Sequence, residues 1–247
     1  DPFFKFGGLG DVARSLPSAL KELGVDIRNI IPFYKVLKLG RNKKTKVGKF
    51  DVKYAGKIEK VEIYQVLNPH SKVLVYLLKN KTYLDVAKSP DTFAFFDKAI
   101  VEIVRKNYIS WLPDIIHCND HHTGLIPLLL RAMKSSVKTI LTIHNLSYQG
   151  RSSIQVLEKL NISHLKSKIM NWEIESRQMN FLMEGIIHAD IVTTVSPTYA
   201  KEIMTEEFGV GLEEVLRGKE GRVFGILNGI DVSLNHYLNG KALKYPY

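Results

Sequence analysis

The sequence is a basic chain of 247 residues with a formal net charge of +10 and 45% hydrophobic residues. This length accommodates one large domain or two small ones, and the apolar fraction is enough for a sizeable core. Because no run of about 18 apolar residues and no signal-peptide pattern occurs, we expect neither a membrane span nor secretion. The single cysteine, Cys118, excludes a disulfide within the chain and fits the reducing cytoplasm.

The positive charge is concentrated between Lys35 and Lys60, where ten Lys or Arg residues are accompanied only by Asp51 and Glu59 as acidic residues. Few aromatic residues are interleaved, although stacking aromatics are typical of nucleic-acid sites. The pattern therefore predicts a solvated, mobile segment rather than a nucleic-acid interface, and no nucleic acid or membrane is expected as a partner.

The first motif along the chain is Lys5-Phe6-Gly7-Gly8-Leu9-Gly10, which precedes the helical apolar pattern of residues 13–23. Glycine lets an anion approach the backbone N–H groups, and a helix start adds partial positive charge. The motif therefore predicts a phosphate-binding loop. Such a loop follows a buried strand, and residues 1–4 are too short for one, so we expect that the first strand is missing from this sequence.

The same stretch allows a second interpretation. Residues 8–13 also fit the G-x-G-x-x-A fingerprint of dinucleotide-binding proteins. That fingerprint requires an acidic residue after the next strand, predicted at residues 25–31, and none is there. Arg41 keeps an NADP-type oxidoreductase open as an alternative.

The remaining elements alternate between strands and helices. Strands are expected at 60–66, 72–78, 114–117, 139–143, 190–195 and 222–227, and helices at 93–106, 125–133, largely throughout 151–187, and at 197–204. This order predicts an α/β fold with a doubly wound parallel sheet of the Rossmann type.

Polar residues follow four of these strands. They are Asp120, His144, Ser196 and Asn228. Because the carboxyl ends of parallel strands meet at one edge, we expect a ligand crevice there. Asp120 suits hydrogen bonds from sugar hydroxyls or stabilisation of positive charge at a sugar carbon, and a neutral His144 suits donation to a hydroxyl, oriented by Asn145.

The segment 117–122 contains three histidines and a cysteine, but a strand sends His117 and Cys118 to opposite faces, so no metal site is expected. The sequence has no Gly-x-Ser-x-Gly, Walker lysine or His-Glu-x-x-His motif.

Together these motifs resemble the bacterial glycogen synthases and plant starch synthases, glucosyltransferases of the two-domain GT-B architecture. The matching stretches, in order and in register, are 5–12, 117–123, 142–150, 194–200 and 225–231. The resemblance implies that residues 1–231 form the N-terminal catalytic domain, that residues 232–247 are an unassigned tail, and that the C-terminal nucleotide-binding domain is absent. The family usually has Trp where this chain has His121.

The resemblance also implies a function, namely transfer of glucose from ADP-glucose to the non-reducing end of an α-1,4-glucan, with retention and without a metal or cofactor. Lys5, Gly7 and Gly8 would hold the phosphates, and Asp11 would shape the cleft. Asp120 and His144 would hold the transferred glucose. The isolated chain is expected to have little activity, and a non-catalytic glucan-binding module is a further alternative.

Overall fold

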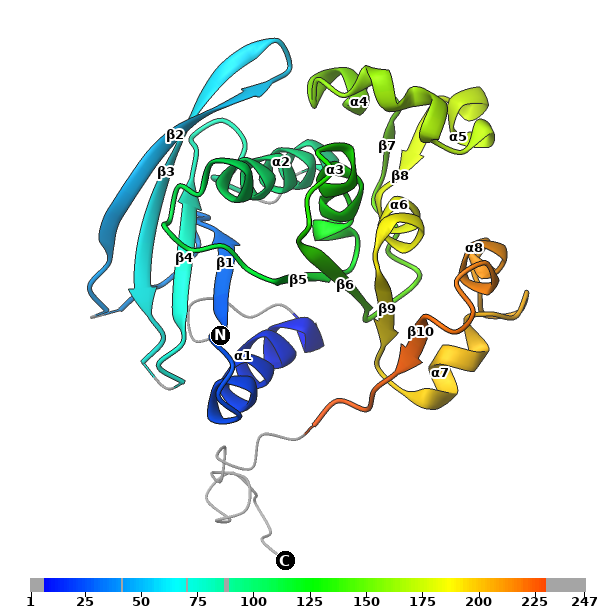
Figure 1. Ribbon diagram of the computed structural model, residues 1–247, viewed down its shortest axis with the longest axis horizontal. Coiled ribbons are helices and arrows are strands. Elements are labelled where there is room, and N and C mark those ends of the chain that lie inside the picture. Colours follow the sequence, from blue (N-terminus) through cyan, green and yellow to red (C-terminus); the bar gives the residue numbers. More distant parts are fainter. Residues whose placement is uncertain (1–6, 41, 70, 87–88, 230–247) are drawn as a thin grey trace, which may run out of the picture.

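The computed structural model describes residues 7–40, 42–69, 71–86 and 89–229. Lys5 and the tail at 232–247 lie outside the described residues. In chain order the elements are α1 Gly7–Glu22, β1 Arg28–Pro32, β2 Thr45–Tyr54, β3 Lys57–Leu67, β4 Leu74–Lys79, α2 Pro90–Lys106, β5 Ile115–Asn119, η1 His121–Thr123, α3 Ile126–Ala132, β6 Lys138–Ile143, β7 Arg151–Ser153, α4 Val156–Lys159, η2 Ser163–Lys168, α5 Asn171–Ser176, β8 Gln178–Asn180, α6 Phe181–His188, β9 Ile191–Thr194, α7 Pro197–Glu202, α8 Glu213–Arg217 and β10 Val223–Gly225 (Figure 1).

The strands form two four-stranded sheets and one short pair. Sheet A has the order β1-β4-β3-β2, sheet B has the order β10-β9-β6-β5, and β7 pairs with β8. All pairs in sheet B are parallel, as is the pair of β1 with β4, and helices alternate with these strands. The predicted α/β class with parallel strands is therefore confirmed.

The lysine-rich segment departs from expectation, because its residues 45–54 form strand β2, which pairs antiparallel with β3. The side chains of Phe50, Val52 and Tyr54 are buried, while Asp51 and Lys53 between them are exposed. This alternation with a period of two gives β2 one apolar face, which packs into the main core. The interpretation of a mobile segment was wrong because charge density hid the alternation.

Helix α1 begins at Gly7, earlier than the sequence suggested, so the glycines form its first turn. Its amphipathic pattern leaves Val12, Leu16 and Leu20 partly buried. Asn29 of β1 donates its side-chain amide to the Ala13 carbonyl at 3.3 Å, which ties the helix to sheet A.

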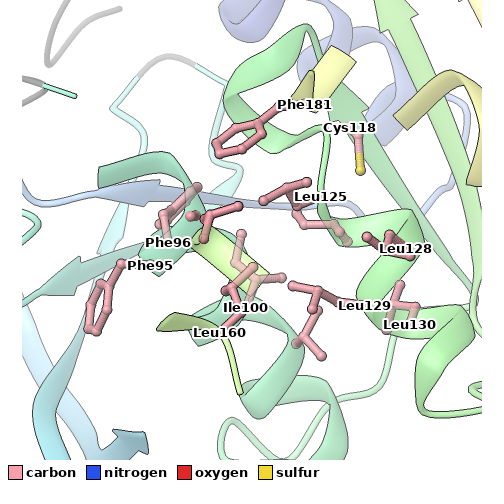
Figure 2. Close-up of a cluster of buried hydrophobic side chains, with 14 of the residues drawn as sticks. Phe95, Phe96, Ile100, Cys118, Leu125, Leu128, Leu129, Leu130, Leu160 and Phe181 are labelled. Atoms are coloured by element: carbon pink, nitrogen blue, oxygen red, sulfur yellow. The ribbon is translucent and has the colours of Figure 1, made fainter. Parts of the chain in front are cut away.

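Helix α2 lies between sheet A and α3 and supplies the central part of the main core (Figure 1). Phe95 packs edge-on against Tyr54 of β2, with ring centroids 5.4 Å apart. Figure 2 shows the part of this apolar cluster in which α2, α3 and the start of α6 meet Cys118 of β5. Burial of such side chains contributes roughly 1.5–3 kcal/mol each. Because residues of α2 and of both sheets belong to the same buried cluster, α2 joins the two sheets through one core.

Sheet B presents two different faces. Cys118, Leu141, Ile143 and Val192 are buried in the core. Alternation along each strand places Asn119, Thr142 and Thr193 on the opposite face. One face of sheet B is therefore apolar and covered by helices, and the other carries polar side chains.

Two glycines permit the close approach of η1 to α6. A Cβ added to Gly124 would lie 2.3 Å from the Phe181 carbonyl oxygen, and one added to Gly185 would lie 3.0 Å from the Gly124 carbonyl oxygen. No side chain fits there without moving backbone.

Two buried carboxyl groups, Glu173 of α5 and Glu184 of α6, form a cluster with His188, and Glu184 is the neighbour of Gly185 in the chain. Glu173 of α5 accepts a hydrogen bond from the backbone N–H of Asn180 at 2.6 Å, and Glu184 Oε2 lies 3.2 Å from His188 Nε2. Burial raises the pKa of Glu173 to about 9 and that of Glu184 to about 7. Glu184 adds to the rise at Glu173, whereas Glu173 opposes the rise at Glu184. Burial lowers the pKa of His188 to about 4. The cluster therefore holds protons on its carboxyl groups that the unfolded chain would release.

None of the helices among the described residues is both long and apolar enough to cross a membrane.

The glycine contact predicts a large stability loss for Gly124→Ala. The added methyl group meets backbone rather than a movable side chain, so we expect a loss of about 2 kcal/mol or more in urea denaturation. Gly218→Ala is the matched control, because Gly218 has right-handed helical angles and an added Cβ there approaches other atoms no closer than 3.4 Å. Its stability should change by less than about 1 kcal/mol. Equal losses of stability in the two variants would contradict the close backbone contact between Gly124 and Phe181.

The carboxyl cluster predicts a stability that falls with rising pH. A carboxyl whose pKa is raised on folding stabilises the fold at low pH and loses that contribution as pH rises through its folded pKa. The free energy of unfolding should therefore drop by about 2 kcal/mol or more between about pH 7 and pH 9. His188 contributes the opposite slope only below its ordinary pKa of 6.5. Glu173→Gln should flatten the decline, whereas Glu158→Gln on an exposed surface should not.

Candidate functional site

Asp120 follows strand β5 in a conformation that few residues adopt. Its φ is 51° and its ψ is −165°, a combination in which a Cβ is strained. The Asp120 N–H donates to the Thr142 carbonyl at 2.9 Å, which continues the parallel pairing of β5 with β6 by one residue. The backbone then turns sharply into η1, leaving the Asp120 side chain 7% exposed. Backbone strain of this kind is found where a side chain must be aimed.

The Asp120 carboxylate is held by the residues that follow β6. Its Oδ1 accepts hydrogen bonds from the N–H groups of His144 at 2.8 Å and of Asn145 at 3.4 Å. Burial raises the pKa of Asp120 above its ordinary value, and these N–H donors oppose the rise. The structure therefore brings together three of the predicted site residues.

The His144 imidazole has a partner of its own. His144 Nε2 lies 3.0 Å from Asn119 Oδ1. Burial lowers the pKa of His144, so the ring is neutral near pH 7. Asn145, expected to orient this ring, instead accepts a hydrogen bond from the Ser147 N–H at 3.0 Å through its side chain. The orienting contact comes from Asn119.

The histidine-rich segment divides between the two faces of sheet B. His117 Nε2 lies 2.6 Å from Thr142 Oγ1, and Thr142 Oγ1 lies 2.6 Å from Thr193 Oγ1. Cys118 is buried on the other face, where burial raises the pKa of its thiol. Among the described residues, no three His, Cys, Asp or Glu side chains converge as a metal site would require.

His121 borders a second part of the site. Its ring contacts both Phe93 and His122, which also contact each other, and its Nδ1 donates to the Tyr148 carbonyl at 2.9 Å. The ring also borders a pocket of about 350 Å³ lined by Ser147, Tyr148, Gln149, Gly150, Arg151 and Val210. Phe93 and His122 therefore provide the aromatic contacts of the His121 ring. Burial lowers the pKa of His122 to about 4, so this aromatic wall is uncharged near neutral pH.

The other predicted residues lie on separate elements. Gly7 and Gly8 begin α1, and Asp11 is exposed one turn farther along the helix. A Cβ built on Gly8 meets no atom of the described residues within 4 Å, so packing within them does not account for this glycine. Ser196 caps α7 by accepting a hydrogen bond from the Tyr199 N–H at 3.0 Å. Asn228 is exposed.

Sequence reasoning overlooked Asn119. In sheet B, Asn119 pairs with Thr142, and His144 follows Thr142 by two residues on the same side. Only the strand register reveals that Asn119 and His144 share a face. The sequence does show that Asn119 lies at a strand end, because it directly precedes Asp120, but it does not show which residue Asn119 contacts.

A comparison with protein-family models matches residues 1–218 to the starch synthase catalytic domain. A glycogen synthase of Thermotoga petrophila is 39% identical over 263 aligned residues, covering 100% of this chain and 54% of that protein. A glycogen synthase of Desulfitobacterium hafniense is 40% identical over 249 residues, covering 93% of this chain and 51% of that protein. The chain spans about half the length of these curated relatives.

Among solved structures, the fold is similar to the catalytic domain of starch synthase IV from Arabidopsis thaliana bound to ADP and acarbose. The TM-score is 0.85 at 29% sequence identity, and the match covers 96% of this chain and 50% of that chain.

The backbone at Asp120 predicts that Asp120→Ala and Asp120→Gly differ in stability. Both remove the acceptor of the His144 N–H, which costs about 1–3 kcal/mol. Glycine also relieves the strain of a positive φ, so Asp120→Gly should be about 1 kcal/mol more stable than Asp120→Ala. Thermal and urea denaturation measure this difference. An alanine variant as stable as the glycine variant would contradict the strained conformation.

Proposed function

Because the chain belongs to the starch synthase catalytic domain family, we propose that it takes part in transferring glucose from ADP-glucose to the non-reducing end of an α-1,4-glucan. The transfer retains the configuration of the sugar carbon and needs neither a metal nor a cofactor. The observation that carries this proposal is a buried carboxylate fixed beside a neutral imidazole at the carboxyl ends of β5 and β6. Family membership favours this function over the oxidoreductase alternative.

Asp120 and His144 bind the transferred glucose in this proposal. Departure of the nucleotide leaves positive charge on the sugar carbon, and a carboxylate in a low-dielectric setting stabilises that charge strongly. Because Oδ1 of Asp120 is held by two backbone N–H groups, its position is fixed before substrate arrives. Fixed charge avoids the cost of reorganisation during the reaction.

The start of α1 binds the phosphates of ADP-glucose. The first N–H groups of a helix have no partner within it, and the positive end of the helix dipole favours anions. Gly7 and Gly8 occupy this first turn, and a Cβ built on Gly8 meets none of the described atoms within 4 Å, which supports close approach of a phosphate. Lys5 adds a positive charge and Asp11 shapes the cleft. The ADP in the starch synthase IV structure supports ADP-glucose as donor.

The chain is the N-terminal half of a two-domain GT-B enzyme in this proposal, with residues 1–231 as its catalytic domain and 232–247 unassigned. The match to about half of each relative supports this division. A C-terminal domain completes the nucleotide site and the catalytic centre, so the chain alone has little activity. The enzyme works in the cytoplasm.

Transfer of labelled glucose into glycogen by the intact protein tests this function. We expect incorporation from ADP-glucose to exceed incorporation from UDP-glucose. Asp120→Asn should lower kcat by about 100-fold or more, since the charge that stabilises the transition state is lost. Lys5→Ala should weaken donor binding. Glu158→Gln, on the exposed surface of α4, is the control and should transfer glucose at the wild-type rate. Absence of incorporation from both donors would overturn the proposal.

A further inference from the structure

The contact between Asn119 and His144 joins a side-chain amide to one nitrogen of the His144 ring. Asn119 Oδ1 lies 3.0 Å from His144 Nε2, while Asn119 Nδ2 lies 3.5 Å from the His117 carbonyl oxygen. With the amide turned the other way, two oxygens would face each other at the His117 carbonyl. The amide oxygen therefore faces the ring, and since this oxygen can only accept, Nε2 donates.

The backbone on both sides of this contact is fixed. Asn119 donates its N–H to Thr123 Oγ1 at 2.6 Å, and the Thr123 hydroxyl donates to the Asn119 carbonyl at 3.1 Å. On the other side, the His144 N–H is bound to the Asp120 carboxylate at 2.8 Å. The amide and the ring therefore meet in a geometry that neither residue sets alone.

We propose that Asn119 is a positioning residue that holds His144 as the Nε2–H tautomer and leaves Nδ1 as a hydrogen-bond acceptor. His144 then receives a hydrogen bond from a hydroxyl group of the bound sugar through Nδ1. This reverses the expectation that His144 donates to the substrate. The identity of the hydroxyl as a sugar group rests on the proposed function, but the tautomer does not.

The charged groups around His144 bear on this tautomer. Asp120 favours the protonated ring, whereas a charge on the His144 ring would disfavour a charge on His117 or His122. Burial outweighs the effect of Asp120 and lowers the pKa of His144. A neutral ring has two possible tautomers, and Asn119 selects between them.

Nitrogen-15 NMR of the protein labelled at histidine tests the assignment without any substrate. We expect Nε2 of His144 to give the shift of a protonated nitrogen and Nδ1 that of an unprotonated one near pH 7, with His144→Gln identifying the signals. A proton on Nδ1 in the wild-type protein would overturn the proposal.

Two variants separate positioning from simple structural support. Asn119→Leu removes the acceptor, so the two nitrogen shifts should converge as both tautomers become populated. Asn119→Asp keeps an acceptor and adds charge, so it should retain the tautomer and raise the His144 pKa by about one unit or more. Asn161→Asp makes the same chemical change at an exposed turn and should alter neither property. An unchanged tautomer in Asn119→Leu, or an unchanged His144 pKa in Asn119→Asp, would contradict the role of Asn119.

The kinetics of the intact protein provide the functional test. Asn119→Leu should lower kcat for glucose transfer by about tenfold or more with a smaller change in KM, because the hydrogen bond matters most as the sugar reacts. A wild-type kcat in this variant would overturn positioning for catalysis. If the NMR assignment holds but the wild-type protein transfers no glucose, the tautomer stands and the proposed function fails.

Discussion

The hydrogen bond from the His144 N–H to the Asp120 carboxylate depends on the parallel pairing of β5 with β6. This pairing brings the ends of two strands, 24 residues apart in sequence, to the same edge of sheet B. The bond closes that edge and fixes both the carboxylate and the backbone of the residue that carries the imidazole. The strained backbone of Asp120 persists because the Thr142 carbonyl and these N–H donors hold it from two sides. Pre-organisation of the site is thus a consequence of strand register.

Burial determines the chemical character of this edge. Desolvation disfavours charge, which keeps His122 and His144 neutral, while directed N–H groups favour the ionised form of Asp120 and oppose its desolvation. The main core beneath, where α2, α3 and α6 meet, removes solvent from one side of sheet B. The apolar face provides stability, and the polar face of the same strands provides the candidate site. Alternation of side chains along a strand makes both possible in five or six residues.

The two parts of the proposed substrate site come from different physical sources. The phosphate part uses backbone N–H groups at the start of α1, and the sugar part uses side chains at the ends of β5 and β6. Much of the net charge of +10 lies outside both parts, since five basic residues are on the β2–β3 hairpin, namely Lys46, Lys49, Lys53, Lys57 and Lys60. There Lys49 and Lys53 are exposed opposite the buried apolar side chains of β2. The charge therefore solvates an edge strand, a common protection against strand-to-strand association.

The sequence by itself determined the α/β class, the alternating elements and the placement of Asp120 and His144 at strand ends, because side-chain periodicity and strand-end motifs are local features. It did not determine that Asn119 contacts the His144 ring or that Asn145 binds Ser147, and the start of α1 at Gly7 was equally hidden. It also missed β2, because the dense charge hid the alternation that buries Phe50, Val52 and Tyr54. Register and face selection decide these contacts, and both follow from packing between residues far apart in sequence, which only the tertiary structure contains.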